Sequence, residues 1–364
     1  MSRIAILTSH LAPGDAVSND VIGMSDALQR RGYESRIYAG SWDITEPQVY
    51  PVEEITQFLR DPQDLLIYHH SIAWVPGQEL LRDLNSRKAI KYHNVTPPEF
   101  FIGISPWHEE KCREGRGELT DVAGAGCEIY LADSEFNCQD LIDAGAPTAK
   151  CFVVPPFHHV ERLEGLDADL DVLDKYRDGK TNILMVSRIA PHKGHEALIE
   201  AFAAYHLDYN RESRLIIVGK EEEPFKIYSQ RLRELASFML IDGAVVFTGG
   251  VTDQELRAYY LLANLFAIAS EHEGFCVPII EAMAMKVPIV AYGSSAIPAT
   301  LADAGILINQ RSPYLMAEAM HRLASDEELN VAFGIRGRQR YDQHFTEQKI
   351  EAALFNSVSS LESK

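Results

Sequence analysis

Short apolar runs alternate with amphipathic stretches from one end of the chain to the other. This alternation is typical of parallel sheets whose strands are joined and covered by helices. In the first half, the pattern predicts strands at 3–8, 35–39, 65–69, 89–93, 128–132 and 151–154. In the second half, it predicts strands at 182–186, 214–218, 244–248, 265–269, 288–291 and 305–308. This arrangement indicates an α/β protein made of two Rossmann-like domains.

The division between the two domains is expected between Pro155 and Thr181. Pro155 and Pro156 end a strand, and the stretch 163–178 is acidic and polar. The last predicted helix follows a complete second domain. We therefore expect three parts, at residues 1–165, 166–345 and 346–364.

Charge and composition narrow the class of protein. The chain has 364 residues and a net charge of -19, so its surface repels nucleic acid and anionic lipid. No run approaches the roughly 18 apolar residues of a membrane span, and the opening MSRIAILTSH predicts a strand rather than a signal peptide. The five cysteines show no metal-ligand spacing and indicate reduced thiols. We expect a cytoplasmic protein that binds no nucleic acid and makes at most peripheral membrane contact.

The stretch from Ala269 to Ala291, ASEHEGFCVPIIEAMAMKVPIVA, carries the strongest chemical signal. Its apolar run predicts a helix that begins near Val277. The loop before that helix contains Glu273, Gly274 and Phe275. Backbone N–H groups at such a position have no intrahelical partner and attract anions, above all phosphates.

Glu281 lies about two turns into the same predicted helix. A carboxylate in apolar surroundings needs a partner, and it accepts two hydroxyls well, as from the cis-diol of a ribose. Phosphate donors, a diol acceptor and the carboxylate of Glu273 together indicate a nucleotide-sugar site. Two solvated glutamates with an accidental spacing are the alternative interpretation.

Two cations follow the first strand of the second half, in the sequence VSRIAPHKG. Arg188 and Lys193 on this loop can hold a diphosphate and offset the charge on a departing nucleotide. A basic surface loop is the alternative. The strand end at Phe247 and Thr248 would present backbone groups to a nucleobase.

The first strand of the chain is followed by a loop that contains Gly14 and Asp15. Gly14 allows a left-handed backbone turn, and Ser18 or Asn19 could cap the helix that follows. An ordinary strand-to-helix connection is equally compatible with these residues.

A histidine, His93, follows a strand of the first half on the ligand-facing edge of such a sheet. The stretch Tyr68-His69-His70-Ser71, which ends the preceding strand, could shape the acceptor side. A lone histidine is often a structural residue, which is the alternative for His93.

The stretches in the second half resemble a family signature. EGFCVPIIEAMA followed by PIVA is similar to the pattern E-G-F-G-L-P-x-x-E-A-M-A-x-G-x-P-V-V-A of the retaining glycosyltransferases of family four. SRIAPHKG is similar to the G-R-x-x-x-x-K-G element of that family. Ser187, Cys276 and Met285-Lys286 depart from these patterns, and Ala299 stands where a glutamate often follows a proline. The resemblance covers nearly the whole chain and is more specific in its second half.

The resemblance implies the GT-B fold, in which two Rossmann-like domains with parallel sheets face each other across a cleft. The N-terminal domain would take the acceptor and the C-terminal domain the nucleotide sugar, and the terminal helix would cross back to the first domain. The loop at Gly14 and Asp15 would face the donor phosphates and the acceptor. His93 would reach the donor sugar.

The implied reaction moves a mannose- or glucose-type hexose from a GDP-sugar or UDP-sugar to a hydroxyl of a saccharide or lipid-linked acceptor, with retained configuration. Negative charge grows on the leaving phosphate, where Arg188, Lys193 and the amides near Gly274 would stabilise it. Glu273 would bind the sugar and Glu281 the ribose. We expect no catalytic metal and no further cofactor. A sugar-nucleotide sensor without transfer activity, and a phosphorylase or epimerase on the same scaffold, remain alternatives.

Overall fold

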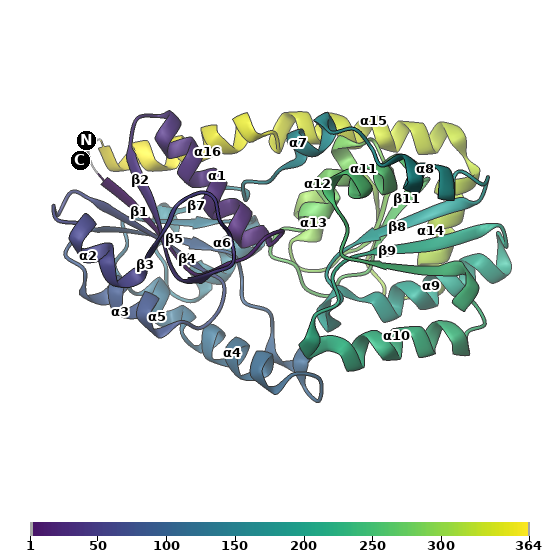
Figure 1. The fold of residues 1–364 in the computed structure, drawn as a ribbon, viewed down its shortest axis with the longest axis horizontal. Coiled ribbons are helices and arrows are strands. Elements are labelled where there is room, and N and C mark those ends of the chain that lie inside the picture. Colours follow the sequence, from purple (N-terminus) through teal and green to yellow (C-terminus); the bar gives the residue numbers. More distant parts are fainter. Residues whose placement is uncertain (1–2, 363–364) are drawn as a thin grey trace. The chain divides into compact units, whose positions relative to one another are not determined.

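The computed structural model describes residues 3–362, which form two compact units. Within these residues, the first unit comprises 3–98, 107–159 and 346–362, and the second comprises 99–106 and 160–345. Each unit has its own parallel sheet, its own covering helices and its own buried core (Figure 1). The predicted architecture of two Rossmann-like domains is therefore confirmed.

The sheet of the first unit has seven parallel strands in the order β3-β2-β1-β4-β5-β6-β7. The strands are β1 (Arg3–Leu11), β2 (Glu34–Trp42), β3 (Val49–Pro51), β4 (Leu65–His70), β5 (Arg87–Tyr92), β6 (Ile129–Ala132) and β7 (Cys151–Val153). The inner strands are largely buried because helices cover both faces of the sheet. The strand order reverses next to β1, so the chain crosses from one side of β1 to the other between β3 and β4.

The helices of the first unit lie on both faces of this sheet, with α1 and α16 on one face and α2 and α3 on the other (Figure 1). They are α1 (Ala16–Arg30), α2 (Ile55–Phe58), α3 (Val75–Asp83), α4 (Pro106–Gly117), α5 (Leu119–Ala123), α6 (Glu135–Asp143) and α16 (Glu347–Glu362). Although α16 ends the described chain, its Ile350 and Leu354 are buried in the same core as Ile4 and Ile6 of β1.

The sheet of the second unit has six parallel strands in the order β10-β9-β8-β11-β12-β13. The strands are β8 (Thr181–Val186), β9 (Ser213–Val218), β10 (Val245–Gly249), β11 (Leu265–Ile268), β12 (Ile289–Tyr292) and β13 (Ile306–Ile308). The chain adds β9 and β10 on one side of β8 and then returns to add β11 on the other side. The strand order therefore reverses between β8 and β11.

The helices of the second unit also cover both faces, with α9, α10 and α14 on one and α8, α11, α12 and α15 on the other (Figure 1). They are α7 (Val160–Gly165), α8 (Leu170–Tyr176), α9 (His195–Asp208), α10 (Lys226–Phe238), α11 (Asp253–Leu262), α12 (Val277–Ala284), α13 (Ile297–Leu301), α14 (Pro313–Ser325) and α15 (Glu327–His344). Among residues 3–362, no helix is both long enough and apolar enough to cross a membrane.

The acidic stretch 163–178 is folded into the second unit. Its residues form the end of α7 and the whole of α8, and Leu163, Val172 and Tyr176 are buried in the core of that unit. The chain passes from the first unit to the second between His159 and Val160. The acidic side chains of this stretch mark the solvent-facing side of short helices, which is why composition alone suggested a connecting segment.

Candidate functional site

The carboxyl ends of β8 and β11 lie side by side at the point where the strand order of the second sheet reverses. The two strands pair directly, with Leu265 opposite Ile183 and Phe266 opposite Leu184. In open α/β sheets, ligands bind outside the carboxyl ends of strands at such a reversal. The loop after β8 carries Arg188 and Lys193, and the loop after β11 carries Glu273, so this is where the sequence-predicted residues meet.

Close backbone approach holds these two loops together. The N–H of Glu271 donates to the carbonyl of His192 over 2.8 Å. Gly194 has a φ of +68°, and a Cβ at this position would lie 1.9 Å from the carbonyl oxygen of Ala269. Only glycine fits there, because a side chain would collide with the backbone of the neighbouring loop. The sequence pattern Lys-Gly is thus explained by packing as well as by charge.

Lys193 and Glu273 form an ion pair across the two loops, in which the ammonium contacts both carboxylate oxygens. The Nζ atom of Lys193 lies 2.8 Å from each carboxylate oxygen of Glu273. Their side chains are 16% and 7% exposed, so water screens the pair poorly. The N–H of Glu273 donates to the Oγ of Ser295 over 2.7 Å, which fixes the backbone of the glutamate. An ammonium has three protons, and Glu273 takes two of them.

Arg188 lies on the same loop as Lys193 but is more accessible. Its side chain is 53% exposed, and its guanidinium lies 3.4 Å from Glu222. Both cations act on the buried His192, whose pKa is held well below its usual value by burial and then by the charges of Lys193 and Arg188. The structure therefore gathers two cations around one neutral histidine.

The amino end of α12 contains the predicted anion-binding loop. Cys276 precedes the helix in a left-handed conformation, with a φ of +79°. Phe275 points into the core, where its ring meets the edge of Phe345 at 5.6 Å between centroids. Its carbonyl accepts from the hydroxyl of Thr300. The side chain of Phe275 therefore serves packing, and of the predicted pair Gly274 and Phe275 only backbone groups could meet a ligand.

Glu281 lies on α12, as predicted, and its partner is a tyrosine. The hydroxyl of Tyr260 on α11 donates to Oε2 of Glu281 over 2.6 Å. Burial raises the pKa of Glu281 to about 7, although the bond from Tyr260 acts to lower it, and the carboxylate of Asp253 adds to the rise. Near neutral pH this carboxyl group is therefore poised between its two charge states.

This raised pKa predicts a pH-dependent cost in stability. The folded protein binds a proton at Glu281 that the unfolded chain releases near pH 4.5, so stability falls as pH rises from about 4.5 to about 7. We expect Glu281→Gln, which does not titrate, to be more stable than the ligand-free wild type at pH 8 by on the order of 1–3 kcal/mol. At pH 4 the difference should largely vanish.

Urea unfolding of both proteins at pH 4 and pH 8 measures this change. Glu234→Gln, at an exposed glutamate of α10, is the matched control. Its free energy of unfolding should equal that of wild type at pH 4 and again at pH 8. A Glu281→Gln variant that is less stable than wild type at pH 8 would contradict the raised pKa assigned to Glu281.

The remaining predicted residues of the second unit lie at the end of β10. The hydroxyl of Thr248 donates to the carbonyl of Gly249 over 2.9 Å, so it is turned back on its own strand. The guanidinium of Arg233 lies over the ring of Phe247, 4.6 Å from its centroid. The strand pairing shifts between Phe247 and Gly249, which leaves an irregular strand end at the carboxyl edge of the sheet.

In the first unit, the loop after β1 is fixed by a helix cap. Gly14 is in the left-handed region, with a φ of +75°. Asp15, rather than the expected Ser18 or Asn19, is the N-cap of α1, and its Oδ2 accepts from both the N–H and the hydroxyl of Ser18, at 2.9 and 3.0 Å. A carboxylate satisfies the free amides of a helix start particularly well, so Asp15 has a structural partner whatever else it binds.

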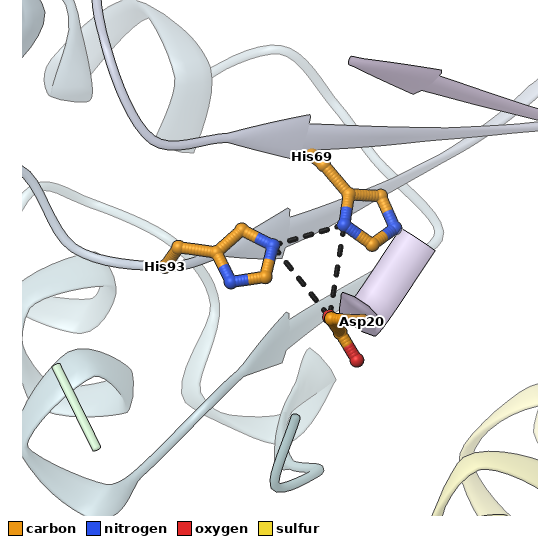
Figure 2. A group of neighbouring side chains, drawn as sticks. All are labelled: Asp20, His69 and His93. Atoms are coloured by element: carbon orange, nitrogen blue, oxygen red, sulfur yellow. Dashed lines mark hydrogen bonds and ion pairs between the residues drawn. The ribbon is translucent and has the colours of Figure 1, made fainter. Parts of the chain in front are cut away.

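His93 lies in a buried polar cluster at the carboxyl edge of the first sheet. Figure 2 shows Asp20 of α1, His69 of β4 and His93, which follows β5, with their side chains directed toward one another. Nδ1 of His69 lies 2.9 Å from Nε2 of His93, and Nδ1 of His93 lies 2.9 Å from Asp133. The side chain of His93 is only 5% exposed. Both of its ring nitrogens therefore already have partners within the unit.

The cluster also contains a lysine, which decides its charge balance. Nζ of Lys91 lies 2.6 Å from Asp133 and 3.7 Å from Asp20. Burial raises the pKa of Asp20. At Asp133 burial acts in the same direction, but the charges of His93 and Lys91 outweigh it and lower the pKa. Burial and these same neighbours lower the pKa of His69.

Asp20, His69 and His93 could together hold a metal ion, because their ligand atoms lie within 4.8 Å of one another and nitrogen and carboxylate ligands suit zinc. The ammonium of Lys91 already lies beside both Asp20 and Asp133. A dication added next to it would meet a like charge in a buried site, which is costly.

Sequence reasoning missed several of these partners. It did not find Tyr260, Asp20, Lys91 or Asp133. Lys91 could have been noticed, because a charged residue between the apolar Ile90 and Tyr92 of an inner strand needs a buried partner. The pairing of Tyr260 with Glu281 had no such signal, since the two residues lie on different helices.

Comparisons with known proteins agree with this geometry. Residues 174–340 match the family described as Glycosyl transferases group 1. The chain is 28% identical to the GDP-mannose-dependent alpha-(1-6)-phosphatidylinositol monomannoside mannosyltransferase of Mycobacterium tuberculosis, over 93% of each chain. In fold it is similar to sucrose-phosphate synthase from Thermosynechococcus elongatus, with a TM-score of 0.80, 17% identity and all of both chains covered.

A second solved structure, Anabaena Alr3699/HepE in complex with UDP-glucose, has a TM-score of 0.76 and 16% identity, over 99% of this chain and 100% of that one. The matched segment 174–340 contains Arg188 and Lys193 on the loop after β8, Glu273 on the loop after β11, and Glu281 on α12. Fold and similarity agree: the chain has the GT-B fold, and its residues 174–340 are similar to the group 1 glycosyltransferases.

Proposed function

We propose that the protein is a retaining hexosyltransferase that moves mannose, or a glucose-type hexose, from a GDP- or UDP-sugar to a hydroxyl of a saccharide or lipid-linked saccharide. The ion pair of Lys193 and Glu273 at the reversal of the second sheet carries this proposal. The similarity to a GDP-mannose-dependent enzyme supports mannose. The fold shared with a UDP-glucose complex supports keeping glucose in the first donor screen. The free cysteines of the described chain suit the cytoplasm.

The chemistry follows from the charges at the site. When the bond between the anomeric carbon and the diphosphate oxygen breaks, negative charge collects on the leaving group. Lys193, held by Glu273 but with one proton to spare, and the accessible Arg188 would donate to that group. Glu273 would accept from sugar hydroxyls, and Glu281 from the ribose. No step of this proposal requires a metal ion or a further cofactor.

His93 enters the proposal as a hydrogen-bond partner of the transferred sugar. The Nε2 of His93 faces His69 and its Nδ1 faces Asp133. Binding a sugar hydroxyl would therefore require the ring to exchange its contact with His69 for one with the substrate. The loop at Gly14 and Asp15 would lie toward the donor phosphates and the acceptor.

A two-stage experiment tests the function. Thermal shift with GDP-, UDP- and ADP-sugars identifies the donor, because a ligand that binds only the folded state raises the melting temperature. The stabilising donor is then supplied with labelled sugar and a panel of saccharide acceptors, and the anomeric configuration of the product is read by NMR. An α-linked product from an α-linked donor is expected. Binding without hydrolysis or transfer would identify a sensor, and an inverted product would contradict retention.

A further inference from the structure

Tyr260 is held rigidly against Glu281 by its surroundings. The tyrosine is 1% exposed, and its ring stacks with Phe266 of β11 at 6.3 Å between centroids. Its hydroxyl donates to Oε2 of Glu281 over 2.6 Å and lies 3.4 Å from the carbonyl of Pro278. A hydrogen bond to a charged acceptor is about twice as strong as one between neutral groups, so this contact favours the carboxylate form of Glu281 over the acid.

The bond uses one oxygen of Glu281 and leaves Oε1 outside it. A cis-diol has two hydroxyls to donate, and an ionised carboxylate accepts both better than a protonated one, in which one acceptor site has become a donor. We propose that Tyr260 is a positioning residue that favours the carboxylate form of Glu281 and holds it toward the ribose of the donor nucleotide. This inference rests on the ribose role of Glu281 in the proposed function, and it adds that nucleotide affinity depends on pH near neutrality.

Burial raises the pKa of Glu281, and the hydrogen bond from Tyr260 is the main effect that lowers it. From α11, Asp253 opposes ionisation of Glu281. Cys276, before α12, is uncharged, because burial holds the pKa of its thiol well above its usual value. From α15, Arg338 meets α12 at its far end, where it donates to the carbonyl of Ala284 over 3.0 Å. Among the described residues, Tyr260 is therefore the one whose hydrogen bond favours the anionic form of Glu281.

The test is the dissociation constant of the donor nucleotide, measured by calorimetry from pH 6 to pH 9. For wild type, affinity should weaken below about pH 7, where Glu281 takes up a proton. For Tyr260→Phe, the midpoint of this profile should rise by about one to two pH units, which lowers affinity at pH 7 by about 5- to 50-fold, and affinity should recover toward pH 9. Tyr259→Phe is the matched control. It removes the hydroxyl of a neighbouring buried tyrosine, whose ring packs against Tyr176. The pH dependence of nucleotide affinity should stay as in wild type.

A second variant keeps the packing intact in case Tyr260→Phe does not fold. Incorporation of 3-fluorotyrosine at position 260 retains the ring and hydroxyl but makes a stronger donor, so the midpoint should move to lower pH. A Tyr260→Phe variant that loses affinity equally at every pH, or a fluorinated protein with an unmoved midpoint, would overturn the positioning role. Glu281→Gln separates the positioning role of Tyr260 from the ribose role of Glu281. If this variant binds nucleotide as tightly as wild type at pH 9, the ribose role of Glu281 itself fails.

Discussion

Replacement of Lys193 by alanine is expected to lower kcat/KM for sugar transfer by about 10²–10³-fold, the loss typical of one preorganised donor to a developing anion. Two effects act together. The leaving diphosphate loses a cation, and Glu273, which is only 7% exposed, keeps a carboxylate without its counter-ion. Steady-state transfer at saturating acceptor measures the change. The effect should fall on kcat more than on donor binding, because the charge on the leaving group is greatest in the transition state.

Matched variants separate this role from a general change of charge. Lys226→Ala removes a 66% exposed lysine of the same unit, paired with Glu223, and should leave transfer unchanged. The double variant Lys193→Ala, Glu273→Gln should lose less than the product of the two single losses, since the residues act as a pair. Arg188→Ala should be milder, because its guanidinium is half exposed. Wild-type rates in both Arg188→Ala and Lys193→Ala would exclude the diphosphate assignment.

The strands were predictable because buried parallel strands leave continuous apolar runs in the sequence. Each predicted strand has a counterpart within a few residues of its expected ends. The exception among the described strands is β3, which was not predicted. It has only three residues, Val49–Pro51, all partly exposed at the edge of the first sheet. A short edge strand that contains proline carries neither an apolar run nor a clear alternation.

The site was predictable where residues close in space are also close in sequence. Arg188 and Lys193 share one loop, and Glu273 and Glu281 share one loop and helix, so their spacing carried information. The contacts that join these segments were not predictable. Lys193 and Glu273 are 80 positions apart, and no local pattern encodes a pairing that depends on which strands are neighbours.

Asp15 shows how a local preference can be assigned to the wrong residue. Ser18 and Asn19 have good N-cap side chains, but the helix begins three residues earlier, and Ser18 instead donates to the true cap. The buried cluster around His93 shows the second kind of failure. Its members come from α1, β4, β5 and the residue after β6, and only the folded sheet brings these positions to one edge.

Gly194→Ala is expected to destabilise the second unit by about 2–4 kcal/mol, the sum of a left-handed conformation forced on alanine and an overpacked contact. The added Cβ would lie 1.9 Å from the carbonyl oxygen of Ala269 and 2.5 Å from its carbonyl carbon. Both are backbone atoms, so no side chain can turn aside, and the loop after β8 must move away from the loop after β11. A melting temperature lower by about 5–15 °C is expected for a unit of this size.

Gly179→Ala isolates the conformational part of this effect. Gly179 has a φ of +86°, also in the left-handed region, but a Cβ there would meet nothing within 4 Å. Its substitution should cost only about 1 kcal/mol and leave transfer intact. Gly194→Ala should in addition separate Lys193 from Glu273 and lower the transfer rate of the protein that remains folded. Equal melting temperatures for the two variants would show that the loops do not depend on this contact, and the ion pair would then have to be held by its charges alone.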